Sequence, residues 1–462
     1  TSYAGAGGGG AGIGGAIFVA NNARLIIQDS VSLSGNQTQG GAAGIDPGRG
    51  NYPDGQSFII PARPGEGFAD DIFLYRDAEL IFQNEEHLLA DFSIQSDPQS
   101  LQDKGIRKEG SGTVTMISQK NNYRGSTVIN EGTISIASDV LGDPSSQLVF
   151  EGGTLEATDT FSLRRDIILN SEGTISVNPS HELTLGFIDS DGLLTKTGEG
   201  TLVLTASAPT GNLIIDEGIV QGGSSSIQDD VLINNLGTLV FNQERAGTYV
   251  GKISGTGNLV KAGDEKLSFI GVDGFTGNTT IQKGTLVIPA EQKFASNSVN
   301  VISTLQNNGT INADVITNHG YIFGSGTFNT SIMKNFGFVE PGNSIGTLTI
   351  NGNYTQDSSG KLGIEIDATG ENDLLEVAGI ASLDGELSIS LAPGVYLKGT
   401  TYTFLTAESV TGEFSRTTSS RPLDYRINYL SNQVQLSLED PSVVINIDDS
   451  NLTGNPESVE NC

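Results

Sequence analysis

The chain of 462 residues contains no Trp, one Cys, three His and only 14 Pro. Aromatic residues make up 6% of it and charged residues 17%, compared with the roughly 25% charged residues that soluble domains usually carry. A chain with so few bulky side chains cannot fill one large globular core, but it can fill a long and narrow one. No stretch of sequence approaches the roughly 18 consecutive apolar residues of a membrane-spanning helix.

Basic residues are scarce as well. The chain has 24 Lys and Arg against 54 Asp and Glu, a formal net charge of -30, and this excludes nucleic acid and anionic membranes as partners. The single cysteine, Cys462, is the last residue, so no disulfide is expected within the chain. The start, Thr1-Ser2-Tyr3, lacks the basic and apolar regions of a signal peptide, so we expect a processed protein or a fragment of a longer one.

Glycine is abundant, with 61 residues, and much of it falls in a regular motif. Glycine followed by threonine and an apolar residue occurs nine times, and two looser copies fill the gaps at Gly218 and Gly257. The mean spacing between these glycines is about 21 residues, which indicates stacked repeating units. The nine copies begin at Gly132, Gly153, Gly173, Gly200, Gly237, Gly284, Gly309, Gly326 and Gly346.

The short period selects the fold. Alternation such as Thr133-Ile134-Ser135-Ile136 points every second side chain inward, while the glycine permits a corner with positive φ. A period of about 21 residues is too short for a propeller blade or an immunoglobulin domain, and the leucine-rich pattern is missing. We therefore predict an all-β fold, a right-handed parallel β-helix with roughly 15 to 20 coils of about 20 to 22 residues.

Four segments are predicted along the chain. Residues 1–107 form a Gly-rich β-helix start with an irregular insertion, in which 85–91 is predicted to be a short helix. Residues 108–340 form the repeat region, 341–438 a run of long regular strands that caps the β-helix, and 439–462 an acidic linker. Within the repeat region three longer modules begin with Lys-x-Gly, at 108–136, 196–220 and 261–288.

The most specific sequence lies in the block 340–414. It includes Glu-Pro-Gly-Asn-Ser-Ile-Gly-Thr-Leu from residue 340 and Asp-Leu-Leu-Glu-Val-Ala-Gly from residue 373. This block resembles the carboxyl-terminal passenger region of Gram-negative autotransporters (type V secretion), and the Lys-x-Gly modules look like the autotransporter-associated β-strand repeat. The two matches together cover residues 108–438.

The resemblance implies a passenger that is secreted or displayed on the outer membrane, with 341–438 acting as an autochaperone-like cap. It also implies a β-barrel translocator on the same precursor. Only 24 residues follow Leu438, so no barrel is expected within the chain, and an excised passenger is expected. Gly14-Gly15-Ala16-Ile17 with Leu33-Ser34-Gly35-Asn36 is also similar to the paired tetrapeptides of chlamydial polymorphic membrane proteins, which repeat the pair many times and prefer Phe in place of Leu33.

Two catalytic or cofactor motifs occur in the sequence. Ser344 stands in Gly-x-Ser-x-Gly, but strand-like sequence follows it and no histidine occurs after His319, so Gly346 is interpreted as a repeat corner. The segment 10–15 fits the dinucleotide pattern, with Asp29 in the place of a ribose-binding acid, but no strand precedes it.

Acids and histidines complete the candidates. Among the carboxylate pairs Asp70/Asp71, Asp189/Asp191 and Asp229/Asp230, only the second can share one strand face, and it is interpreted as a turn. The histidines, His87, His181 and His319, are too far apart to predict a zinc site. We expect no catalytic, cofactor-binding or metal-binding residue, although calcium on turn carboxylates stays open.

The sequence thus predicts a monomeric, non-enzymatic passenger that acts in adhesion or host-cell contact. Binding is expected on loops that interrupt the coils, first 44–105 and 205–212, with a host-cell receptor, matrix or surface glycan as partner. Two alternatives stay open. One is a carbohydrate-active lyase or glycosidase with carboxylates in a lateral groove, and the other is a stalk that only displays the first hundred residues.

Overall fold

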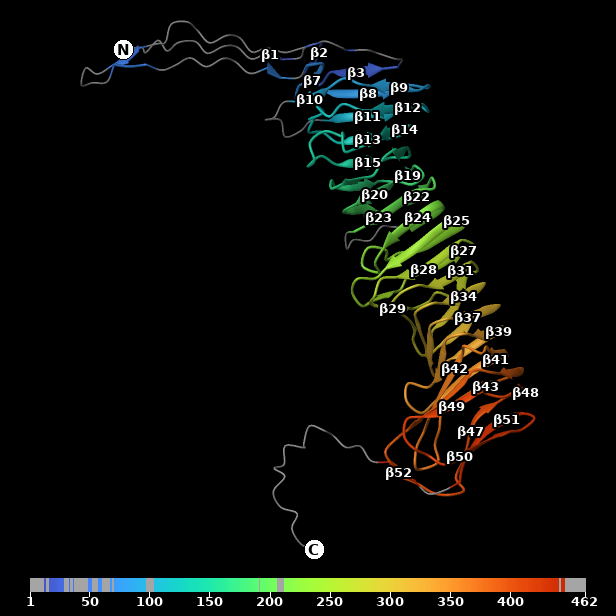
Figure 1. Cartoon of the computed structure of the whole chain (residues 1–462). Coiled ribbons are helices and arrows are strands. Elements are labelled where there is room, and N and C mark those ends of the chain that lie inside the picture. Colours follow the sequence, from blue (N-terminus) through green and yellow to red (C-terminus); the bar gives the residue numbers. More distant parts are fainter. Residues whose placement is uncertain are drawn as a thin grey trace. The chain divides into compact units, whose positions relative to one another are not determined.

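The computed structural model describes residues 12–13, 16–28, 33, 36, 49–51, 57–59, 67–68, 70–96, 104–190, 192–205, 212–439 and 442–444. The chain divides into two compact units, residues 1–241 and 242–462. All regular elements of the described part are β-strands, which stack in parallel as solenoids with about 14 turns in total (Figure 1). The predicted all-β parallel solenoid is confirmed, with fewer turns than expected. Across these residues there is no helix that could cross a membrane.

Successive coils of the first unit place their strands on three faces. The first face holds β3 (Arg24–Ile27), β8 (Glu79–Gln83), β11 (Gly105–Glu109), β13 (Thr127–Ile129), β15 (Leu148–Phe150), β18 (Ile167–Leu169) and β21 (Ile188–Ser190). The second holds β9 (Leu88–Ala90), β12 (Thr113–Met116), β14 (Thr133–Ile136), β16 (Thr154–Ala157), β19 (Glu172–Val177), β22 (Leu193–Thr197) and the first parts of β24 (Asn212–Gly222) and β25 (Val231–Asn242). The third holds β17 (Phe161–Leu163), β20 (Glu182–Leu185), β23 (Thr201–Leu204) and the second parts of β24 and β25.

Three smaller pairings precede these ladders in the sequence. They are the parallel β2 (Ile17–Val19), β7 (Ile72–Leu74) and β10 (Ile94–Ser96), the pair β1 (Gly12–Ile13) and β6 (Gly67–Phe68), and the antiparallel hairpin β4 (Arg49–Asn51) and β5 (Ser57–Ile59).

The second unit repeats the three-faced arrangement. Its first face holds β26 (Gly247–Tyr249), β29 (Lys266–Phe269), β32 (Thr285–Ile288), β35 (Thr304–Asn307), β38 (Tyr321–Gly324), β40 (Phe338–Pro341), β42 (Lys361–Ile366), β45 (Glu386–Leu391) and β49 (Arg416–Ser419). Its second face holds β27 (Ile253–Gly255), β30 (Gly274–Phe275), β33 (Lys293–Ala295), β36 (Thr310–Asn312), the first parts of β39 (Thr327–Asn335) and β41 (Thr347–Gln356), β43 (Leu374–Val377) and β47 (Thr401–Thr406). Its third face holds β28 (Asn258–Ala262), β31 (Asn278–Ile281), β34 (Ser298–Val301), β37 (Val315–Asn318), the second parts of β39 and β41, β44 (Ile380–Leu383) and β48 (Ser409–Gly412).

The parallel stacking of the second unit ends in antiparallel strands. β51 (Gln433–Leu438) pairs antiparallel with both β47 and β50 (Tyr425–Tyr429), and β46 (Gly394–Tyr396) pairs antiparallel with β52 (Ser442–Val444). Antiparallel strands that fold back over the last coils occupy hydrogen-bonding groups that an open strand edge would present to another chain.

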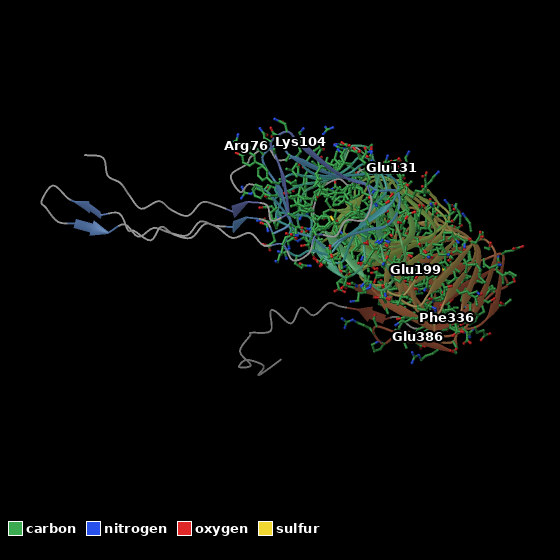
Figure 2. The ribbon with its side chains drawn as sticks, turned by 90° about the horizontal axis from the view of Figure 1, so that it is seen from above. Arg76, Lys104, Glu131, Glu199, Phe336 and Glu386 are labelled. Atoms are coloured by element: carbon green, nitrogen blue, oxygen red, sulfur yellow. The ribbon has the colours of Figure 1, made fainter. Side chains whose placement is uncertain are left out.

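The core of each unit is a stack of inward-pointing aliphatic side chains. Ile134, Leu155 and Ile175 occupy matching positions of adjacent coils, and all three are fully buried. The threonine that precedes each of them faces outward. Burying one such side chain stabilises the fold by about 1.5 to 3 kcal/mol. The recurring motif therefore marks one core position per coil. Charged side chains such as Glu131 and Glu199 lie at the periphery of the first unit (Figure 2).

Coil length differs between the units. In the first unit Thr133 is in register with Thr154, 21 residues later, as predicted. In the second unit Thr304, Tyr321 and Phe338 are in register at intervals of 17 residues. These coils are shorter because only two residues join successive strands at 308–309, 313–314 and 319–320.

Two expectations about local structure need correction. The helix predicted at 85–91 is wrong, because Leu88 and Ala90 point into the core as part of β9 and pair with β12. The left-handed corner is found at Gly132 (φ 67°) but not at every copy of the motif. At Gly237 the reason for glycine is close approach, since a Cβ there would lie 2.4 Å from the carbonyl oxygen of Ile215.

Polar side chains also stack inside the second unit. The side-chain amide of Asn318 donates to Oδ1 of Asn335 at 2.8 Å, and both residues are fully buried. Nδ2 of Asn335 donates in turn to the Tyr354 hydroxyl and to the Lys361 carbonyl, each at 3.1 Å. Gln356 continues this interior amide ladder with a 2.7 Å bond to the carbonyl of Asp384. The ladder satisfies buried groups that would otherwise lack partners.

Candidate functional site

The Lys-x-Gly motif of each module places a lysine inside the solenoid. Lys108, Lys196 and Lys261 are at most 1% exposed. Each ammonium donates to the carbonyls of its own turn, and in the second and third modules it also reaches the following coil. For Lys196 the acceptors are the carbonyls of Thr197, Gly198 and Glu217, at 2.7, 2.5 and 3.2 Å. The lysine therefore ties a turn to its neighbour, a role that sequence reasoning missed although the lysine itself marked each module.

Burial lowers the pKa of Lys196 to about 8, from an ordinary 10.5, because desolvation disfavours the charged form. Between these two values the unfolded chain holds a proton that the folded chain has lost, so the free energy of unfolding should rise with pH. We predict that wild type gains up to about 3 kcal/mol over Lys196→Met between pH 7 and pH 10. Urea unfolding of both proteins at the two pH values measures this, and parallel pH profiles would contradict it.

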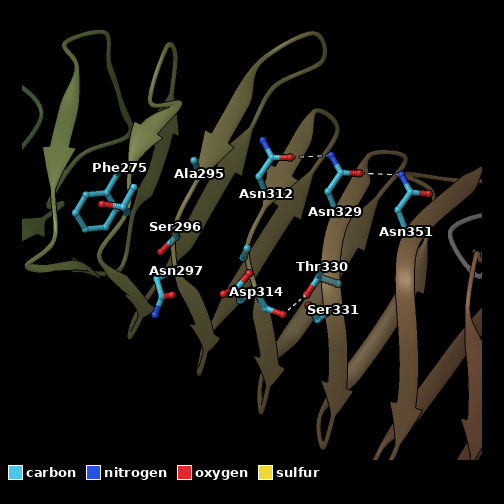
Figure 3. Close-up of a pocket in the computed structure, with 12 residues that line it drawn as sticks. Phe275, Ala295, Ser296, Asn297, Asn312, Asp314, Asn329, Thr330, Ser331 and Asn351 are labelled. Atoms are coloured by element: carbon cyan, nitrogen blue, oxygen red, sulfur yellow. Dashed lines mark hydrogen bonds between the residues drawn. The ribbon is translucent and has the colours of Figure 1, made fainter.

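The second unit carries an open lateral groove of about 510 Å³ (Figure 3). It runs across successive coils at the bend between the second and third faces. One wall carries Asn312, Asn329 and Asn351, whose amides form a row: Nδ2 of Asn329 donates to Oδ1 of Asn312 at 2.7 Å, and Nδ2 of Asn351 to Oδ1 of Asn329 at 2.8 Å. The opposite wall carries the exposed side chains of Asn297, Asp314 and Ser331.

Small buried residues form the floor of the groove, namely Ser296, Ala313 and Thr330. The hydroxyl of Ser296 donates to the carbonyl of Gly277 at 2.8 Å, and that of Thr330 to the carbonyl of Asp314 at 3.0 Å. The floor hydroxyls are thus bonded to the backbone, and hydrogen bonding to a ligand is left to the walls. The register of β39 shifts between Asn329 and Ile332, which bends the strand at the floor.

A smaller hollow of about 210 Å³ lies beside β38, β40 and β42. It collects the carboxylates of Glu340, Glu365 and Asp373 with the rings of Tyr321 and Phe323. The Tyr321 ring stacks on that of Phe323 at 5.0 Å, and its hydroxyl donates to Glu340. Sequence reasoning missed this acidic hollow because its members lie on three different coils.

Asp373 is the buried member of the hollow, at 1% exposure. Its oxygens accept backbone N–H groups of Gly346 at 2.9 Å and Glu365 at 2.7 Å, so it fastens two segments together. Desolvation, with the nearby charges of Glu365 and Glu340, raises the pKa of Asp373 to about 7.

The raised pKa makes the second unit sensitive to pH. From about pH 4 to 7 the folded chain holds a proton on Asp373 that the unfolded chain has lost, so this carboxyl's contribution to stability falls as pH rises. We predict a fall of roughly 4 kcal/mol in wild type that is absent from Asp373→Asn. Urea midpoints of both proteins at pH 4, 5.5 and 7 measure this, and equal slopes would refute it.

Several sequence candidates lie in structural contacts. Ser344 is exposed on the loop after β40 and lines the acidic hollow, with no histidine among the residues that line it. Asp70 pairs with Lys120 at 2.9 Å, and Asp71 accepts the backbone N–H of Ser93 at 2.8 Å.

The remaining candidates are dispersed. Asp189 lies in β21, and Asp229 and Asp230 directly precede β25. The histidines stay on separate coils: His87 bonds Thr115 at 2.9 Å, His181 lies 3.5 Å from Asp159, and His319 stacks on Phe336 at 4.9 Å. Among the described residues no group of three or more His, Cys, Asp or Glu is arranged to hold a metal. Asp29, Asp191, most of 10–15, the loop 206–211 and Cys462 lie outside the described residues.

Comparison with known proteins agrees with the modules. The family described as passenger-associated-transport-repeat matches residues 106–136, 194–221 and 259–288, each of which contains one of the buried lysines. The match confirms the three modules predicted from the sequence.

Three relatives share parts of the chain. It is 34% identical to the adhesin BmaC autotransporter of Brucella suis biovar 1 (strain 1330), over 40% of this chain and 6% of the relative. It is 29% identical to an extracellular serine protease of Serratia marcescens, over 38% and 17% of the two chains. It is 25% identical to the probable autotransporter YfaL of Escherichia coli (strain K12), over 52% and 21%. The chain thus spans a fifth or less of each relative's length.

A parallel solenoid with three transport repeats defines the class. The chain is an autotransporter passenger domain, as the resemblance in its sequence predicted. Passengers of this class are displayed on the cell surface or secreted, and this is the location of the chain. The similarity of 14–17 and 33–36 to chlamydial polymorphic membrane proteins stays a prediction, because most of those residues lie outside the described part.

Proposed function

We propose that the chain is a non-enzymatic adhesion passenger that contacts host cells or matrix through the side of its solenoid. The observation that carries the proposal is the lateral groove of the second unit, which presents uncharged hydrogen-bonding groups on repeated coils. The adhesin BmaC, which shares 193 aligned residues with the chain, supports the same function. The monomeric state, the boundaries at 107, 340 and 438, and a translocator on the same precursor are parts of this proposal.

The acids considered for catalysis favour a structural use. Asp71 holds Ser93 on the neighbouring strand, and Asp70 pairs with Lys120. Arg165, fully buried, bonds Asp139 at 2.5 Å and the carbonyl of Leu141 at 2.9 Å. Charged groups with these partners fasten turns and strands, which suits a scaffold for binding.

The test is adhesion of the purified chain to cultured host cells and to immobilised matrix proteins. Saturable binding at nanomolar to micromolar concentration is expected, and its absence on every surface would refute the proposal. Deletion of 44–66 tests the loop placement predicted from the sequence. Residues 72–96 must be kept in that variant because they supply β7, β8, β9 and β10 of the solenoid.

A second candidate function has one specific observation in its favour. The acidic hollow brings three carboxylates together, and the raised pKa of Asp373 is the kind of shift found in acids that act on glycosidic bonds. Release of reducing sugars or unsaturated products from a glycan panel tests it. Activity that disappears in Glu340→Gln and Glu365→Gln would establish the enzyme and refute the adhesion proposal's non-enzymatic part.

A further inference from the structure

The groove of the second unit has unused hydrogen-bonding capacity along its asparagine wall. A side-chain amide carries two N–H donors and an oxygen with two lone pairs. The row uses one N–H of Asn329 and one of Asn351, and one lone pair on each acceptor oxygen of Asn312 and Asn329. The row also fixes the orientation of these amides, so the remaining donors and acceptors are held in place before any ligand arrives.

The opposite wall offers free acceptors. The side chains of Asp314 and Ser331 are exposed, and within the described residues neither the carboxylate nor the hydroxyl is engaged in a hydrogen bond. Asn297 uses its Nδ2 to reach Asn278 at 3.0 Å, which leaves its own oxygen open. The groove therefore pairs a wall that both donates and accepts with a wall that mainly accepts.

Both walls repeat with the coils. Adjacent strands of a sheet lie about 4.8 Å apart, so equivalent groups recur at this interval along the groove. Asn312 and Asn329 stand in matching register, and Asp314 and Ser331 directly precede the register pair Val315 and Ile332. A ligand that fills such a groove should itself be a chain of repeating polar units.

Charge and geometry exclude other polymers. No Lys or Arg lines the groove, Asp314 does, and the chain carries a net charge of -30, so nucleic acid and acidic polysaccharides are repelled. An extended peptide would need an unpaired strand edge, but β36 and β37 are paired on both sides. Hydroxyl groups, which donate and accept at once, match both walls.

We propose that this groove binds an uncharged oligosaccharide, aligned with the stacking direction of the coils. The inference rests on the proposed adhesion function and names its ligand class: a neutral glycan of a host surface or matrix. Asn312, Asn329 and Asn351 bind hydroxyls through their free amide groups, and Asp314 and Ser331 accept hydroxyl protons from the other side. The small floor residues leave room for the sugar rings.

The experiment measures binding of the full chain to neutral oligosaccharides by calorimetry and on a glycan array. The probes are oligomers of glucose, mannose, galactose and N-acetylglucosamine, with oligogalacturonate as the acidic comparison. We expect at least one neutral series to bind, with affinity rising with oligomer length over three to four units. Oligogalacturonate should bind at least tenfold more weakly.

Three variants locate the site. Asn329→Ala removes the central amide of the row and should weaken binding about tenfold, the effect of one lost good hydrogen bond. Ser331→Met narrows the groove from its exposed wall and should do the same without touching the row. Thr317→Met, on the same face but outside the groove, is the matched control and should bind as wild type. Urea midpoints establish that each variant is folded.

Each outcome decides the matter. Loss in both groove variants with a normal control supports the site. Binding that is unchanged in both, or stronger for oligogalacturonate, overturns it. If no neutral glycan binds the folded chain but cells still do, the inference fails while the adhesion proposal stands. If neither glycans nor cells are bound, both fail.

Discussion

Replacing Leu348 with Asp is expected to unfold the second unit. Leu348 is fully buried in β41, in register with Leu375 of β43. An aspartate there must either bury an unpaired charge or pull the strand out of the core, and this places the change among the most destabilising single substitutions, at roughly 4 to 5 kcal/mol or more. Urea unfolding of the purified chain measures the loss.

The matched control lies on the same strand. Thr355 of β41 faces outward and is in register with Lys334, so Thr355→Asp adds the same charge without entering the core. Its urea midpoint should stay close to that of wild type. If the two aspartate variants were equally stable, the core position of Leu348 would be refuted.

The same substitution tests the proposed role of 341–438. If this segment nucleates folding during export, Leu348→Asp and Leu387→Asp should reduce the passenger at the cell surface more than Ile134→Asp does. All three leucine and isoleucine side chains are fully buried, so their thermodynamic cost is comparable. Surface labelling with an antibody measures the amounts, and equal reduction by all three would contradict a special role for the C-terminal block.

Asn335→Leu is expected to have the second largest effect. Leucine has a similar size but cannot accept from Asn318 or donate to the Tyr354 hydroxyl and the Lys361 carbonyl. Each buried group left without a partner costs about 1 to 3 kcal/mol, so a total of roughly 3 to 5 kcal/mol is expected. Urea unfolding measures it.

Asn351→Leu provides the comparison for the interior amide ladder. Asn351 ends an exposed row of the same chemistry, where water replaces a lost partner, so its change should cost less than about 1 kcal/mol. A cost for Asn335→Leu as small as this would show that the interior ladder adds little to stability.

The sequence predicted the fold because its signal is local and repeated. An alternating run such as 133–136 defines one core position and its outward neighbours, and the same pattern returns on each coil. The helix predicted at 85–91 failed because local apolar content was weighed without the partner strand. Pairing of β9 with β12 places Leu88 and Ala90 inward and leaves Leu89 exposed.

The sites were harder to predict because they depend on register between coils. The groove had a readable signal, since Asn312 and Asn329 both follow Gly-Thr-apolar directly. The acidic hollow had none: Glu340, Glu365 and Asp373 are separated by 25 and 8 residues, and only the turn lengths bring them together. Turn length is set by backbone geometry at individual corners, which a repeat period does not encode.

The uniform 17-residue spacing of Thr304, Tyr321 and Phe338 makes one coil an interchangeable part. Removing 304–320 would bring Tyr321 opposite Thr285 and leave the inward and outward positions of later strands unchanged. A duplication of the same length would insert a further rung. Evolution or an engineer can therefore shorten or lengthen this surface in single steps, and with it the number of sugar units it can hold.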